Sequence, residues 1–522
     1  MSFDCSVDSP GWQSWRALRN ASQGIARNIP FHFFPGREIL RDAAPPMAAH
    51  SQPMADSQNS IPANSAATQP HLRRVLTLWD LIFYGIVLIQ PIAPVPLYGV
   101  AQKLSDGHFL MTIFIAMGAM LITAFSYGRM AALYPAAGSA YTYVGRGLNP
   151  HLGFLAGWAM ILDYILQPVI NTVWISITLH DRYLDYHIPQ IPFVAWAAVI
   201  AGIVTYLNLR GVKTSAVANK ILLFFMFIVV ALFIFLALKY LIAANGWSGV
   251  ASTLPLYDPK TFKWPTVMTA TSFAALTYIG FDGVTTLSEE VVNPKRNVLL
   301  ACVLTCVFAG VISALEVYLG ALVQPNWHSF PSLESAFMDI CRQVGGLLLF
   351  HGMGAILILA AFGSALTGGL GAARLLFGMG RDNVLPRKIF GHLSSKTSTP
   401  SYSILLIGAV TFAGAIALNY IGNAYEHAGE TLNFGAFLAF MGVNFATFWQ
   451  FIVLGQPGRK KRPFVDALLP LFGFVFCAYI WWNLNPIAKE VGAVWFVLGV
   501  ALLLIKTRGF RDKPVVINFT ES

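Results

Sequence analysis

The chain has 522 residues, of which 56% are hydrophobic and 11% are charged, and its formal net charge is +10. A soluble domain usually carries about 25% charged residues, so this composition excludes a soluble globular protein. The apolar runs are about 20 residues long, which predicts an all-α integral membrane protein and excludes an outer-membrane barrel. Basic residues are spread over many loops, which argues against binding of nucleic acid.

Residues 1–76 contain the stretch PPMAAHSQPMADSQNSIPANSAATQP, which is rich in Ser, Pro, Ala, Asn and Gln and has no periodicity. This composition predicts a disordered tail. The tail lacks the compact apolar stretch of a signal peptide. Met1, Met47 and Met54 are all candidate translation starts.

The membrane domain, residues 77–508, contains about twelve segments long enough to cross a bilayer. They are 79–101, 109–133, 151–180, 191–208, 218–242, 266–288, 298–322, 347–378, 402–420, 431–455, 464–484 and 491–506.

Basic residues indicate the orientation of these spans, because cytoplasmic loops carry an excess of Lys and Arg. If the N-terminal tail is inside, the inner loops hold most of the basic residues, including the run GRKKR that ends at Arg462. We therefore expect both termini, including a C-terminal tail of residues 509–522, to be cytoplasmic. The outer loops hold only Lys103, Arg182, Lys239, Lys260, Lys263, Arg342 and Lys489.

The first span is interrupted by the stretch VLIQPIAPVP, which runs from Val87 to Pro96. Proline in a helix interior removes an N–H donor and clashes with the preceding turn. The sixth span, TATSFAALTYIGFDGVTTLSEE, carries Gly280, Asp282 and Gly283 near its middle. Either interruption alone could be a simple kink or packing bend. Two interruptions five spans apart indicate an inverted-repeat transporter with its site at the midplane.

Three stretches make the chain resemble the amino acid–polyamine–organocation (APC) superfamily, and within it the bacterial putrescine importers. They are YPAAGSAYTYVGRGLNPHLGFLAGWAMILDY (134–164), YIGFDGVTTLSEEVVNPKRNV (278–298) and GSALTGGLGAARLLFGMGRDNVLP (363–386). The resemblance covers roughly residues 75–510. It implies a five-plus-five inverted repeat with discontinuous spans one and six, two extra helices, alternating access and a bacterial-type inner membrane.

The first break departs from the glycine- and serine-rich break of amino acid carriers in this superfamily, because Pro91, Pro94 and Pro96 offer no N–H groups to a carboxylate. Its carbonyl groups remain acceptors, which favours an amine ligand. Asp163 and Asp282 are candidate partners for the two ammonium groups of a diamine, although Asp163 could instead pair within the bundle. The predicted substrate-binding residues are Ile89, Gln90, Pro91, Ile92, Ala93, Asp163, Tyr164, Tyr278, Gly280, Phe281, Asp282 and Gly283.

Aromatic side chains could form walls around a bound cation. The candidates are Tyr141, Tyr143, Trp158, Tyr164 and Tyr278, although a tyrosine in a membrane span is more often an interface or packing residue.

Coupling and gating have three further candidates. Glu316, inside the seventh span, could be structural or could carry a proton. Glu289 and Glu290, at the inner end of the sixth span, could form an inner gate or a solvated charged loop. Some superfamily members place a lysine on the fifth span, but here Lys220 lies too near the cytoplasmic end. A proton is therefore the expected coupling ion. No phosphate-binding loop, metal site or cofactor site is expected.

The resulting hypothesis is a secondary importer of a small, putrescine-like amine. The alternative in the same class is an amino acid permease for a neutral or cationic amino acid. A channel would not need two matched breaks with buried acids. A membrane-embedded enzyme would need a cluster of His, Ser or Cys, whereas His351 stands alone. The oligomeric state stays open.

Overall fold

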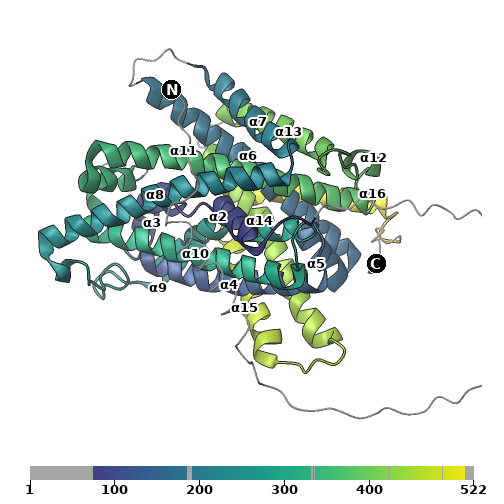
Figure 1. Cartoon of the computed structure of the whole chain (residues 1–522). Helices are drawn as coiled ribbons and strands as arrows, with labels where there is room; N and C mark the ends of the chain where they lie inside the picture. Colours follow the sequence, from purple (N-terminus) through teal and green to yellow (C-terminus); the bar gives the residue numbers. More distant parts are fainter. Residues whose placement is uncertain are drawn as a thin grey trace, which may run out of the picture. The chain divides into compact units, whose positions relative to one another are not determined.

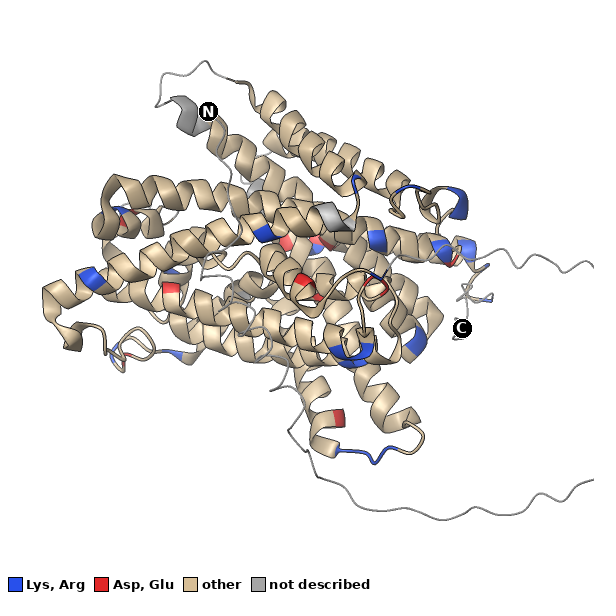
Figure 2. Cartoon of the chain, viewed as in Figure 1, with Lys and Arg blue, Asp and Glu red and all other residues tan. Residues whose placement is uncertain are grey.

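The computed structural model describes residues 74–184, 191–330, 333, 335–420, 424–484 and 486–511. Nearly all of both predicted tails lies outside these residues, so the domain limits stay predictions. The described chain is helical, and its one β-bridge joins Leu76 to Val291. Figure 1 shows the helices packed side by side, and the sparse charged positions appear in Figure 2.

The helices that correspond to predicted spans are, in chain order, α2 (Leu78–Ile89) with α3 (Pro94–Leu104), α4 (Phe109–Leu133), α6 (Pro150–Leu184), α7 (Phe193–Leu209), α8 (Val212–Asn245), α9 (Trp264–Ala274), α10 (Pro294–Val323), α11 (Ala336–Arg381), α13 (Ser401–Asn419), α14 (Ala424–Phe448), α15 (Leu469–Trp482) and α16 (Pro486–Lys506). The short helices α5 (Ser139–Gly147) and α12 (Arg387–Phe390) lie between them.

Among the described residues, nine helices are long and apolar enough to cross a membrane, and the bent pair α2–α3 brings the number to ten. The predicted fourth span corresponds to α7, which is a shorter apolar helix, and the predicted sixth span corresponds to the broken segment that begins with α9. Neither is among these ten. In α11, Gly346 has non-helical angles, so the residues before it form a separate helical piece. The all-helical, multi-span fold is therefore confirmed.

The first span breaks at the prolines. α2 begins with a capping box in which the Thr77 and Asp80 side chains each accept from the other residue's backbone N–H. It ends at Ile89, and the C-cap residue Gln90 has a positive φ of 64° that turns the chain out of the helix. α3 then starts at Pro94, a position that needs no N–H donor, and the two helices are bent by 54°.

The sixth span breaks at its glycine. α9 continues as the 3₁₀ segment η3 (Ala275–Tyr278), and Gly280 then adopts a φ of 117°, which a side chain would strain. A second 3₁₀ segment, η4 (Phe281–Leu287), follows. The two breaks touch, because a Cβ added at Gly283 would lie 2.3 Å from Leu88 Cδ2.

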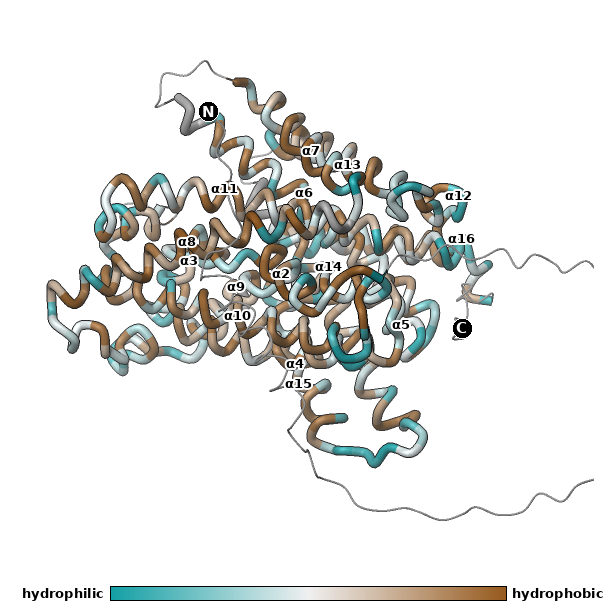
Figure 3. Tube along the Cα trace, viewed as in Figure 1, coloured by the Kyte–Doolittle hydropathy of each residue, from teal (hydrophilic) through white to brown (hydrophobic). Residues whose placement is uncertain are grey.

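The outer faces of the bundle are apolar, as Figure 3 shows along α8 and α13. On α8 the exposed side chains include Ile221, Phe224, Phe225, Ile228 and Phe235. Exposed apolar residues on so many helices would be unfavourable in water and are the expected contact surface for lipid.

Close packing of α14 on α6 generates a testable prediction. A Cβ at Gly435 would lie 2.3 Å from the carbonyl oxygen of Ala159, whereas one at Gly118 of α4 would meet nothing within 4 Å. Gly435→Ala should destabilise the protein by about 1–3 kcal/mol through overpacking. Gly118→Ala should leave stability unchanged or slightly improve it. Thermal unfolding in detergent measures both, and equal midpoints would contradict the assigned packing.

Candidate functional site

Asp282 lies at the centre of the two breaks. Its side chain is 0% exposed, and Oδ2 accepts a hydrogen bond of 2.6 Å from the hydroxyl of Tyr164 on α6. The backbone N–H groups of Gly280 and Gly283 lie near the carboxylate. Oδ1 nevertheless has no hydrogen-bond partner among the described residues. A buried carboxylate with an unused oxygen is an acceptor that is available to a ligand.

Asp163 is the second buried acid at this place. It is 2% exposed, and its carboxylate makes no hydrogen bond to a described residue. It precedes Tyr164, whose hydroxyl binds Asp282, so the two acids lie in the same part of the bundle and their charges interact. Neither carboxylate forms an ion pair with a described Lys or Arg. The structure therefore brings together the two acids that sequence analysis placed on the third and sixth spans.

The backbone of the first break is largely satisfied by the protein. Pro94 and Pro96 cannot donate to the carbonyls of Gln90 and Ile92, which accept instead from the N–H groups of Ala93 and Val95, at 2.8 and 3.1 Å. The carbonyl of Pro91 accepts from the Ser313 hydroxyl of α10 at 3.2 Å. These carbonyls remain acceptors through their second lone pairs.

The N–H groups of the first break are nearly all used. Those of Gln90, Ala93 and Val95 donate to backbone carbonyls within the break or α2. Ile92 alone has an N–H that makes no backbone hydrogen bond among the described residues. The break therefore offers at most one donor to an anion.

A cluster of uncharged polar side chains lies beside the first break, and only Gln90 among them was predicted from the sequence as a site residue. Gln90 Nε2 donates to Asn171 Oδ1 at 2.9 Å, and Gln167 Nε2 donates to Ser364 Oγ at 2.7 Å. Ser364 in turn donates to the carbonyl of Leu88 at 3.0 Å. We call Gln90, Gln167, Asn171 and Ser364 the amide cluster.

The amide cluster joins α2, α6 and α11. Gln90, Gln167 and Asn171 keep part of their surface accessible, whereas Asp282 does not. The signal in the sequence was the spacing of Tyr164, Gln167 and Asn171, which places three polar residues on one face of a membrane helix.

The aromatic surroundings differ from the predicted walls. Phe281 packs with Tyr127 of α4 and Phe440 of α14, at centroid distances of 5.6 and 5.2 Å. Trp158 instead stacks on Trp495 of α16 at 4.6 Å, away from the breaks.

Three of the predicted wall tyrosines contact other parts of the protein. Tyr278 is buried and donates to the carbonyl of Ile113 on α4. Tyr143 packs against Tyr127. Tyr141 donates to Asp382, at the end of α11.

Glu289 and Glu290 form ion pairs across the predicted cytoplasmic end. Arg381 Nη1 donates to Glu289 Oε2 at 2.8 Å, and Arg374 Nε donates to Glu290 Oε1. Both arginines belong to α11 and are almost completely buried. Glu289 also accepts from the backbone N–H of Ala137 at 2.9 Å. The partners thus lie on the eighth span and the segment before α5.

Backbone hydrogen bonds also hold the predicted cytoplasmic ends of the first and sixth spans together. The N–H groups of Val75 and Leu76 donate to the carbonyl of Glu290 at 2.8 and 2.9 Å, and Val292 N–H donates to the carbonyl of Leu76. The start of the first span is thereby attached to the end of the sixth.

Asp382 adds a further acid to this end of α11. Burial raises the pKa of the Asp382 carboxyl, while the neighbouring Arg381 and the Tyr141 hydroxyl act in the opposite direction.

Glu316 lies on α10, one turn beyond the Ser313 that contacts the first break. It is 0% exposed, and neither carboxyl oxygen has a hydrogen-bond partner among the described residues. The structure does not join it to the pair formed by Asp163 and Asp282.

The junction of α2, α8 and α11 is apolar. A Cβ at Gly363 would meet Val87 Cγ1 at 2.5 Å and Leu222 Cδ1 at 3.1 Å, so apolar side chains pack closely against this glycine. Lys220 instead pairs with Asp80 near the start of α2, at 2.6 Å.

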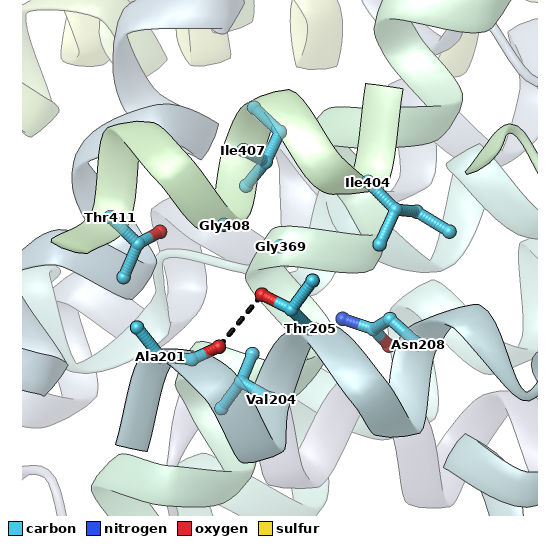
Figure 4. Close-up of a pocket in the computed structure, with 9 residues that line it drawn as sticks. All are labelled: Ala201, Val204, Thr205, Asn208, Gly369, Ile404, Ile407, Gly408 and Thr411. Atoms are coloured by element: carbon cyan, nitrogen blue, oxygen red, sulfur yellow. Dashed lines mark hydrogen bonds between the residues drawn. The ribbon is translucent and has the colours of Figure 1, made fainter. Parts of the chain in front are cut away.

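A small groove lies elsewhere, between α7, α11 and α13 (Figure 4). Thr205 and Asn208 supply polar atoms, but the Thr205 hydroxyl donates to the Ala201 carbonyl at 2.7 Å, and the Asn208 amide donates to Leu366. None of the residues lining the groove is charged or belongs to a break, so the groove lacks the buried acid and the broken backbone of the candidate site.

Comparison with known proteins agrees with this geometry. Residues 76–507 match the family model described as amino acid permease. The chain is 30% identical over 457 residues to the low-affinity putrescine importer PlaP of Escherichia coli, covering 87% of this chain and 98% of that protein. It is 27% identical over 471 residues to the methylthioribose transporter of Bacillus subtilis, covering 84% and 94% of the two chains.

A further relative is the branched-chain amino acid permease BcaP of Lactococcus lactis, which is 25% identical over 472 residues, covering 83% of this chain and 94% of that protein. The family match and these relatives, together with two broken spans that meet at a buried acid, show that the chain is a multi-pass membrane protein of the amino acid permease family within the APC superfamily.

Proposed function

We propose that the protein is a secondary active transporter that imports a small putrescine-like diamine by alternating access, coupled to protons, across a bacterial inner membrane with both termini cytoplasmic. The observation that carries the proposal is the buried pair of Asp163 and Asp282, which has no cationic partner among the described residues. Two neighbouring buried carboxylates repel each other, and a substrate ammonium between them would relieve that repulsion. The relatives that import putrescine or transport amino acids support this class of substrate.

The second ammonium group has a place at the amide cluster. Gln167 lies about one helical turn from Asp163 along α6, a distance of about 5 Å that suits a short diamine. The side-chain oxygens of Gln90 and Gln167 accept no hydrogen bond from a described residue. The acid pair would therefore hold one ammonium group of the diamine, and the uncharged amide cluster would hold the other.

A substrate carboxylate finds little support in this site. The first break has at most one unused N–H, and the N–H groups at the start of η4 already face Asp282. An anion placed there would also meet two acids. Because every amino acid carries a carboxylate, we rank an amino acid permease as the second candidate. The family match and the relative BcaP support that candidate.

The ion pairs at the predicted cytoplasmic end are the proposed inner gate. Substrate release to the cytoplasm would require the end of η4 to separate from α11, which breaks the pairs of Glu289 with Arg381 and Glu290 with Arg374.

Glu316 is the proposed proton carrier, because a carboxyl without a partner is tolerated inside the membrane in its protonated form. A transport role leaves no need for enzymatic chemistry.

Competition for uptake tests the substrate class. Putrescine should inhibit uptake of labelled putrescine at least tenfold better than ornithine, which is the same diamine with an added carboxylate; tenfold corresponds to about 1.4 kcal/mol. The assay uses cells that lack other amine carriers. If ornithine or a neutral amino acid competes better, the permease alternative replaces the proposal.

Substitution of the buried acid tests the site. Asp282→Asn should weaken putrescine binding by about 2 kcal/mol or more, since a desolvated charged partner is lost. Tyr164→Phe, which removes the hydrogen bond to Asp282, should weaken it less. Tyr318→Phe is the control, because that hydroxyl binds the carbonyls of Val250 and Ser252. Equilibrium binding to purified protein measures all three; unchanged binding in Asp282→Asn would exclude this site.

A thiol-labelling experiment tests the gate. Ser139 is buried beside η4, where its hydroxyl lies 2.7 Å from that of Thr285, so a cysteine at this position reports opening. Arg381→Gln should increase labelling of Ser139→Cys by a hydrophilic maleimide in inside-out vesicles. Lys388→Gln, which alters an exposed residue of α12, should not. The gate assignment fails if Arg381→Gln leaves the labelling rate unchanged.

A further inference from the structure

The loop between α14 and α15 combines exposed positive charge with exposed apolar surface. It follows the π-helical segment η6 (Trp449–Leu454) and precedes a second one, η7 (Phe464–Leu468). The connecting residues 457–463 and Phe464, the first residue of η7, are all exposed and include Arg459, Lys460, Lys461 and Arg462. Figure 2 shows this blue loop beside α15, and Figure 3 shows brown segments on either side of it.

A buried acid fixes the conformation of this loop. Asp466 Oδ1 accepts from the guanidinium groups of Arg129 and Arg459 at 2.6 and 2.8 Å, and Oδ2 accepts from the backbone N–H of Arg462 at 2.7 Å. The Arg129 guanidinium also lies 3.6 Å from the ring centroid of Phe451. The loop is therefore held to α4 and η6, and its basic side chains are presented from an anchored backbone.

Three of these charges are not neutralised by described residues. Asp466 is the one acid between residues 449 and 468, and its oxygens already receive three donors. The side chains of Lys460, Lys461 and Arg462 form no ion pair with a described residue. The site therefore has unused positive charge at the level where α14 and α15 leave the predicted cytoplasmic side of the membrane.

Large apolar side chains flank the charges. Leu454 and Phe464 are each 61% exposed and Leu468 is 57% exposed, on the two segments that adjoin the loop. A ligand that matches this surface needs an anionic head for the lysines and an apolar body for the flanking segments. Basic clusters directly adjoining a membrane span bind anionic lipid headgroups by this arrangement.

We propose that the loop of residues 457–464 is a binding site for an anionic phospholipid of the cytoplasmic leaflet. The headgroup phosphate would contact Lys460, Lys461 and Arg462, and the acyl chains would lie against Leu454, Phe464 and Leu468. The proposal does not depend on the identity of the transported substrate.

Lipid titration of the purified full-length protein in detergent tests this site. Native mass spectrometry would compare phosphatidylglycerol with phosphatidylcholine of the same acyl chains. The unchanged protein should prefer phosphatidylglycerol, and the triple variant K460Q/K461Q/R462Q should weaken that binding by roughly tenfold or more. Thermal unfolding without added lipid should be unchanged in this variant, since its side chains are exposed.

A matched variant separates a specific site from general attraction to basic loops. R387Q/K388Q/K396Q removes the same number of exposed positive charges from the α11–α13 connection and should keep the preference for phosphatidylglycerol. Equal loss in both variants, or no lipid preference in the unchanged protein, would overturn the proposal. Displacement of the lipid by inorganic phosphate at comparable concentration would also overturn it, because the site would then bind a soluble anion.

Discussion

The backbone of the two broken spans must find hydrogen-bond partners where there is no water to supply them. In the first break, the prolines remove donors that a continuous helix would provide to the carbonyls of Gln90 and Ile92. Shorter-range N–H groups replace those donors, and Ser313 and Ser364 reach in from α10 and α11 to the carbonyls of Pro91 and Leu88. Neighbouring helices are thereby held around the break.

The same constraint explains the charge pattern of the site. Donors in the first break are nearly all used, while the carbonyls and the acids Asp163 and Asp282 remain able to accept. A site built in this way is rich in acceptors and poor in donors, which is the complement of an ammonium group. The amide cluster extends that acceptor surface along α6 without adding a further charge.

The predicted cytoplasmic end uses charge differently. Glu289 and Glu290 are paired with buried arginines. The N–H groups of Val75 and Leu76 also donate to the backbone carbonyl of Glu290, which holds this end of the protein closed. Loss of one partner of a buried ion pair leaves an uncompensated charge and strongly destabilises the protein, so such pairs are suited to holding a defined closed state. The loop before α15 instead leaves its basic side chains exposed, so it can contact the surface of the membrane.

Local composition and the positions of Pro and Gly were enough to predict the helical membrane class, the two broken spans and the acid at the second break, because these features depend on short stretches of sequence. The sequence also indicated that Lys220 lies too near the membrane edge for a central role. The pairing of side chains is visible only in the folded chain, where Gln90 meets Asn171, Glu290 meets Arg374 and Trp158 meets α16. Such partners come from distant spans, and their contact depends on helix rotation and packing, which no local pattern encodes.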